Sequence, residues 1–91
     1  MTGIESDLLP ILEDLNSGEF RMFTWYLSLD ILENCKPIPK GRLENKIRVE
    51  TVDLILQSYR EELAVMITAE ILRKMQNNKA AEALTKNLLF L

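Results

Sequence analysis

Apolar side chains recur along this chain at the three- and four-residue spacing of amphipathic α-helices, and no stretch alternates as a β-strand would. The first such stretch covers residues 4–15 and contains Pro10. Either that helix starts near Ser6, with the proline in its first turns, or it starts earlier and Pro10 bends it. The same spacing predicts later helices over residues 17–32, 50–59, 61–75 and 79–90. The position of residues 41–46 between two of them indicates one further, short helical turn.

The helix predicted over residues 17–32 has a clear start, because Asn16 and Glu19 have the spacing of a capping box. A helix in a small bundle needs only one apolar stripe for the core. This helix has two nearly opposite stripes, and we expect the phenylalanine stripe to be buried and the tryptophan stripe to be exposed or in contact with something else. The stripes are Phe20, Phe23, Leu27 and Ile31, and Met22, Trp25 and Leu29.

The segment KPIPKGRLEN, residues 36–45, forms an elbow after this helix. Pro37 and Pro39 end the helix, since each disfavours helical angles at the residue before it. Ile38 is expected to anchor the elbow in the core, and Leu43 to point inward. On the later helices, the positions expected to face inward are Val52, Ile55, Leu56, Tyr59, Leu63, Ala64, Ile67, Ile71, Leu72, Met75, Ala80, Ala81, Leu84 and Leu88.

These elements predict one domain over residues 1–91, since 91 residues with 47% hydrophobic side chains suffice for one modest core. The expected fold is an all-α, six-helix antiparallel bundle with short connections, in which the short third helix follows a long basic loop. A core of this size leaves little room for a deep pocket.

Charges of opposite sign are separated along the chain, whose net charge is −3. Residues 1–20 carry five acidic side chains and no basic one, and residues 36–48 carry five basic side chains and one acidic. Solvated surface charge is the simplest interpretation. Two opposite patches can also meet head to tail on neighbouring copies, and such contacts propagate into rings or filaments. Charge complementarity then sets register and rate more than affinity.

The residue types of common catalytic and metal sites are missing. The chain has no histidine, a single cysteine, and three glycines too far apart for a phosphate loop. We therefore expect no enzyme activity, no cofactor and no metal. Cys35 beside Lys36 is expected to be an ordinary loop cysteine rather than a redox-sensitive thiol. Glu61 and Glu62 are expected to complement the amino end of their helix rather than to form a catalytic pair.

The sequence favours a cytoplasmic protein with neither a membrane nor a nucleic-acid partner. Its start, MTGIESDLLP, lacks the basic region of a signal peptide, and no apolar run approaches the roughly 20 residues of a membrane span. A helical DNA-binding domain that uses the basic elbow is an alternative from another class. The sequence pI of about 4.9 argues against it, because DNA binding needs a dominant positive face.

Several motifs taken together resemble the pyrin domains of the death-fold superfamily. They are LLPILEDL, EFRMFTWYL, the elbow IPKGRLE, and YREELAVMITAEILRKM followed by AAEAL. The resemblance covers nearly the whole chain, and a short third helix after a long basic loop distinguishes pyrin domains within the superfamily. It implies a cytosolic module without catalysis that binds other pyrin domains and polymerises during inflammasome assembly in innate immune and inflammatory signalling.

The resemblance also implies two interaction surfaces, because in the family acidic residues of the first and fourth helices pair with basic residues of the second and third. The matching positions are Glu13, Glu50 and Asp53 on the acidic side and Arg21, Lys40 and Arg42 on the basic side. The second helix departs from the family in carrying fewer basic residues. Met22, Trp25 and Tyr26 are therefore apolar interface candidates, since these residue types are enriched in interfaces. Alternatively, Trp25 lies on its own helix or fills a surface groove.

The resemblance leaves the parent protein open. The implied partner is another pyrin domain, either that of an inflammasome adaptor or a second copy, with homo-oligomers or filaments as the possible product. We expect the N-terminal domain of an NLR-type inflammasome sensor. An adaptor and a caspase are alternatives. Because the chain ends at Leu91, directly after the last predicted helix, a stand-alone pyrin-only regulator that caps assembly is another.

Overall fold

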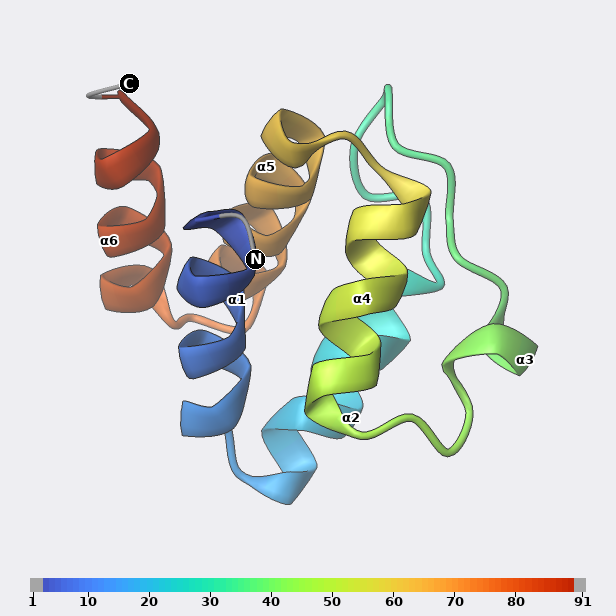
Figure 1. The fold of residues 1–91 in the computed structure, drawn as a ribbon. Helices are drawn as coiled ribbons and strands as arrows, with labels where there is room; N and C mark the ends of the chain where they lie inside the picture. Colours follow the sequence, from blue (N-terminus) through green and yellow to red (C-terminus); the bar gives the residue numbers. More distant parts are fainter. Residues whose placement is uncertain (1–2, 90–91) are drawn as a thin grey trace.

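Over residues 3–89 the fold consists of six α-helices (Figure 1). The computed structural model describes residues 3–89, and side-chain surroundings within residues 3–86. Within that range the chain contains helices and no strand, so the predicted all-α, six-helix bundle is confirmed. The helices are α1 (Gly3–Asp14), α2 (Ser17–Leu27), α3 (Lys40–Leu43), α4 (Arg48–Ser58), α5 (Glu61–Lys74) and α6 (Asn78–Leu89).

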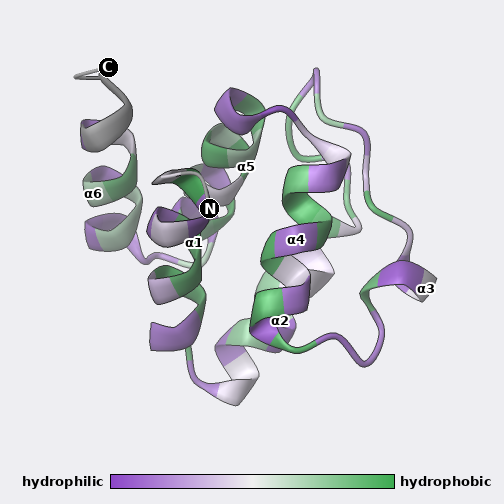
Figure 2. Ribbon diagram, in the orientation of Figure 1, coloured by the Kyte–Doolittle hydropathy of each residue, from purple (hydrophilic) through white to green (hydrophobic). Residues whose placement is uncertain are grey.

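Helix α5 is the centre of the bundle, because it contacts α1, α2, α4 and α6. Its buried residues spread over most of its circumference rather than along one stripe. Four of the predicted inward residues, Ala64, Ile67, Ile71 and Leu72, are buried. Three further residues that spacing did not indicate, Val65, Thr68 and Ala69, are buried with them. In Figure 2 the helices that surround α5 show both hydrophobic and hydrophilic segments, as expected when one side faces a core.

Most of the predicted inward positions of α4 to α6 are buried. Four of them, Leu56, Leu63, Met75 and Ala80, are only half-buried and pack against the core from its edge. Leu88 lies outside the residues whose side chains are described.

Helix α2 ends at Leu27, five residues before the predicted end at residue 32. Its last turn is closed by the Ser28 and Leu29 N–H groups, which donate to Trp25 O and Tyr26 O at 3.0 Å each. Leu29 and Ile31 therefore lie outside the helix, although both are half-buried. The apolar spacing continues past the end of the helix, because the side chains of this non-helical segment are also partly buried against the protein.

The elbow folds back onto the end of α2. The Ile38 N–H donates to Leu27 O at 2.9 Å, and the Ile38 side chain is only 2% exposed. The Tyr59 hydroxyl of the chain just after α4 donates to Lys36 O. The elbow is thus held by a backbone hydrogen bond, a buried side chain and a side-chain hydrogen bond, which explains how so long a connection keeps a fixed course.

Several helix boundaries differ from the predicted ones. Helix α1 begins at Gly3 with Pro10 inside it, which excludes the start near Ser6. Helix α3 ends at Leu43 instead of residue 46, because Glu44 already has an extended backbone with a ψ of 139° and Asn45 follows with a φ of 59°. A right-handed helix allows neither angle. Helix α4 begins two residues before residue 50, and Glu50 caps it by accepting the Ile47 N–H at 3.0 Å.

Candidate functional site

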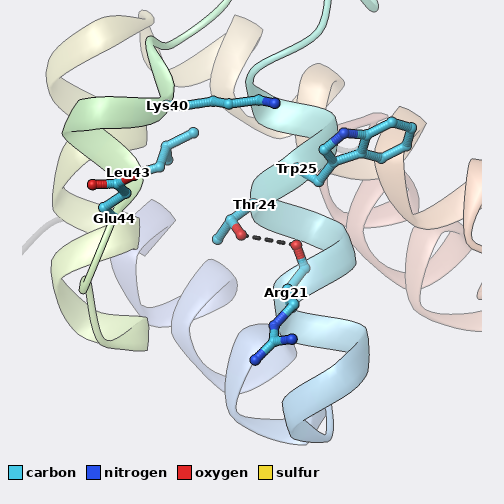
Figure 3. A pocket seen from close by; sticks show the side chains of 6 residues that line it. All are labelled: Arg21, Thr24, Trp25, Lys40, Leu43 and Glu44. Atoms are coloured by element: carbon cyan, nitrogen blue, oxygen red, sulfur yellow. Dashed lines mark hydrogen bonds between the residues drawn. The ribbon is translucent and has the colours of Figure 1, made fainter.

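A shallow hollow between α2 and α3 brings together side chains that are distant in the sequence (Figure 3). It measures about 240 Å³, and we call it the α2–α3 hollow. Figure 3 shows Lys40 extended from α3 toward α2, and Trp25 on α2. The Thr24 hydroxyl donates to Arg21 O at 2.9 Å. The residues that line the hollow are Arg21, Thr24, Trp25, Lys40, Leu43 and Glu44.

Arg21 and Trp25 also line a second hollow of about 310 Å³, together with Gly18 and Met22. Met22 and Trp25 are each 48% exposed, as predicted for the second stripe of this helix. Tyr26 is half-buried, and its ring centroid lies 5.0 Å from that of Trp25. An apolar surface flanked by Arg21 and Lys40 suits a partner that offers apolar side chains next to carboxylates.

The three acidic candidates lie on α1 and α4, which pack against each other. Glu13 in the last turn of α1 and Glu50 and Asp53 in α4 are all exposed. Glu50 also has a structural role, because its Oε1 accepts the Ile47 N–H. Carboxylates from two packed helices therefore face solvent and are available to a cationic partner.

Arg42 does not line the α2–α3 hollow, although it was expected on one surface with Arg21 and Lys40. It lies with Lys46, Glu50 and Asp53 around another hollow of about 320 Å³, which Leu54 and Gln57 complete. Arg42 therefore stands at the boundary between the basic and the acidic candidates. No ion pair joins them: within the described part of the chain, the ion pair is Arg73 with Glu70, at 3.4 Å.

Arg48 has a role that sequence reasoning missed, since it was counted with the basic segment 36–48. Its Nε donates to Leu12 O and its Nη2 to Leu15 O, both at 2.7 Å. Its Cζ lies 4.7 Å from the centroid of the Phe20 ring. Phe20 was expected to be buried, but it is half-buried with this guanidinium over its ring. One feature of the sequence could have indicated this role of Arg48. The last turn of α1 has no basic residue that could bond to the free carbonyls at its end.

Comparison with known proteins identifies the family to which this chain belongs. A family model described as PAAD/DAPIN/Pyrin domain matches residues 7–82. The chain belongs to the pyrin domain family. The solution structure of the pyrin domain of human Pyrin matches it with a TM-score of 0.80 and 27% identity, over 97% of this chain and 99% of that one.

Two curated proteins contain a similar pyrin domain. Caspase b of Danio rerio is 42% identical over 89 residues, which are 98% of this chain and 22% of caspase b. Pyrin of Mus musculus is 35% identical over 80 residues, which are 87% of this chain and 10% of Pyrin. The chain thus spans less than a quarter of either relative.

A pyrin domain is a homotypic interaction module of the death fold and not a catalytic one. In this pyrin domain Cys35 is buried, and burial raises the pKa of its thiol, which disfavours the reactive thiolate. Glu61 and Glu62 lie in the first turn of α5, as predicted. Within the described residues, no three side chains are grouped as metal ligands, and no helix is long and apolar enough to cross a membrane.

Proposed function

We propose that this pyrin domain assembles inflammasome-type complexes in the cytoplasm by pairing with the pyrin domain of another molecule, an adaptor or a second copy. The basic surface of one domain, with Arg21, Lys40 and the apolar side chain of Trp25, meets the acidic surface of the next. The observation that carries this proposal is the α2–α3 hollow. There, Arg21 and the exposed Trp25 of α2 and Lys40 of α3 line one depression.

The acidic half of the contact is supported by Glu13, Glu50 and Asp53. All three are exposed, and their helices pack against each other. A domain with both halves can bind head to tail, so each added domain leaves one surface of each kind open. Arg42 stands at the boundary of the two surfaces, and we place it at the edge of the basic one, where it would contact the partner after Arg21 and Lys40 have docked.

Charge and apolar area contribute differently to this pairing. Exposed charges steer the encounter and are screened by salt, with a Debye length of about 8 Å at 0.15 M. A tryptophan that becomes buried at the centre of a contact slows dissociation. Met22 and Tyr26 extend the apolar area on either side of Trp25.

The parent protein is proposed separately. The 42% identity with caspase b over nearly the whole chain favours a caspase-type parent over the NLR-type sensor that the sequence favoured. In such a parent the pyrin domain would bring catalytic domains together by assembly. A transcript that encodes no catalytic domain after residue 91 would contradict this part of the proposal.

A salt series tests the proposed contact. Binding of a second pyrin domain is measured for the wild type, Lys40→Glu and Trp25→Ala. Lys40→Glu should weaken association most at low salt, and the wild type should itself lose affinity as salt rises. Trp25→Ala should weaken association at every salt concentration. Glu82→Lys, an exposed charge reversal on α6, is the control and should bind like the wild type. Unchanged binding of Lys40→Glu at low salt would show that the elbow is only a spacer.

A further inference from the structure

A single guanidinium ties together the two helices that carry the acidic surface. Arg48, the first residue of α4, reaches back to the end of α1, where it donates to Leu12 O and Leu15 O at 2.7 Å each. The planar guanidinium also lies over the ring of Phe20 in α2. Arg48 is half-buried, and from the start of α4 it contacts the end of α1 and the beginning of α2.

Arginine is the residue that suits this position. The last carbonyls of a helix lack partners within the helix, and α1 has no basic residue in its last turn to satisfy them. A planar guanidinium can donate two N–H groups in a fixed geometry and stack on an aromatic ring at the same time. A lysine would keep the charge, but its single ammonium cannot reproduce that arrangement.

The carboxylates of the acidic surface lie directly beside this connection. Glu13 belongs to the α1 turn between the two carbonyls that Arg48 holds. Glu50 lies two residues after Arg48, and its own carboxylate closes the start of α4. We infer that Arg48 is a positioning residue of the acidic surface: it fixes the α1 and α4 carboxylates relative to each other so that a second pyrin domain meets them as one surface.

Arg48 leaves these carboxylates available to a partner. Within the described residues it forms no ion pair, since its partners are two carbonyl oxygens and an aromatic ring. A surface arginine that paired with Glu13 or Glu50 would instead neutralise the charge that the partner needs. The consequence for binding rests on the proposed function, whereas the geometric claim does not.

The geometric claim is tested by a distance measurement between α1 and α4. Spin labels are placed at Ser6→Cys and Ser58→Cys, two exposed positions, in a Cys35→Ala background. These sites lie far from Arg48 along their helices, so a change of angle at Arg48 is enlarged there. Pulsed electron paramagnetic resonance should give a narrow distance distribution for the parent and a broader or shifted one for Arg48→Lys. Arg73→Lys, at the surface ion pair with Glu70, is the matched control and should change nothing.

Binding of a second pyrin domain is measured on the same variants without labels, well below their melting temperatures. The Kd of Arg48→Lys should be about tenfold higher than that of the wild type, while Arg73→Lys should bind like the wild type. Phe20→Leu, which removes the ring under the guanidinium but keeps an apolar side chain, should give a smaller change of the same kind. It also supplies the test if Arg48→Lys does not fold.

Wild-type distance distributions in both Arg48→Lys and Phe20→Leu would overturn the inference, and so would altered distributions with wild-type affinity. A failure of the proposed function is recognised separately. In that case Asp53→Lys would bind like the wild type, while the distance measurement would still report whether Arg48 positions the two helices.

Discussion

At the scale of single residues, Phe23 is the largest fully buried side chain of α2, with 0% of its surface exposed. Replacing it by alanine removes most of a ring and leaves a cavity that the bundle cannot fully close. Phe23→Ala should therefore lower the free energy of unfolding by about 3–5 kcal/mol. Urea denaturation of the wild type, Phe23→Ala and the exposed control Trp25→Ala measures it. Equal losses in the two variants would contradict the assignment of Phe23 to the core.

Tyr59 links stability to pH. Its hydroxyl donates to Lys36 O, and burial, with a smaller contribution from Cys35, raises its pKa above the ordinary value of 10.0. The unfolded chain loses this proton at about pH 10, and the folded chain loses it only at a higher pH. The stability that the raised pKa contributes is therefore fully present below about pH 10 and is lost as the pH rises through the folded pKa.

The variant Tyr59→Phe separates the two effects of this hydroxyl. At neutral pH it should be less stable by about 1 kcal/mol, because one hydrogen bond to the elbow is lost. Its melting temperature should also fall less steeply than that of the wild type between pH 9 and pH 11, a range that brackets the ordinary pKa of Tyr59. Parallel melting curves of the two proteins over that range would contradict the account.

The contrast between Phe20 and Phe23 shows what a sequence pattern reveals about single residues. Both lie on the predicted stripe of α2, and periodicity treats them alike. Phe23 is fully buried, whereas Phe20 is half-buried under Arg48. The difference comes from a residue far along the chain, so no local pattern could contain it. The same holds for Arg48, whose partners on α1 are more than 30 residues away.

At the scale of helices, spacing predicted five of the helices and their order because each of them needs an apolar side, whereas the short helix in the elbow was predicted from its position. It did not predict their ends, which depend on individual hydrogen bonds. The capping box at Asn16 and Glu19 was predicted correctly, with bonds of 2.8 and 2.9 Å, because both partners are close in sequence. The end of α2 at Leu27 was missed, because the chain after it stays apolar while its backbone leaves the helix.

The end of α5 offers a test at this scale. Gln76 has a φ of 64°, in the left-handed region that favours glycine, and the N–H groups of Gln76 and Asn77 donate to Arg73 O and Leu72 O. Gln76→Gly should therefore raise the free energy of unfolding, by about 0.5–1 kcal/mol. The same substitution inside α4, Gln57→Gly, should lower it by about 1 kcal/mol. Thermal melts that show loss of stability in both variants would contradict this description of the α5–α6 connection.

At the scale of the whole molecule, the separation of charge was visible in the sequence, but its arrangement was not. The resemblance to pyrin domains put Arg21 and Lys40 on one basic surface, and the two do line one hollow together with Trp25. Arg42 has the same sequence context as Lys40, yet it lies on the side of α3 that faces Glu50 and Asp53. Residues two apart on a helix point to different sides of it. Arg42 therefore lies on another side of α3 than Lys40, and its neighbours depend on where α4 lies.

The central claim is that one pyrin domain offers two complementary surfaces of opposite charge. Asp53→Lys reverses a charge on the acidic surface and leaves the basic one intact, and Lys40→Glu does the opposite. Both positions are exposed, so each variant should melt within a few degrees of the wild type.

The most direct measurement is light scattering of each variant alone and of their equimolar mixture, under low-salt conditions in which the wild type assembles. Each variant alone should remain monomeric, because one of its two surfaces repels its counterpart. The mixture should assemble again, since the intact acidic surface of Lys40→Glu pairs with the intact basic surface of Asp53→Lys, and the two altered surfaces, reversed in opposite senses, also attract each other. Assembly of either variant alone to wild-type size, or a mixture that stays monomeric, would contradict the account.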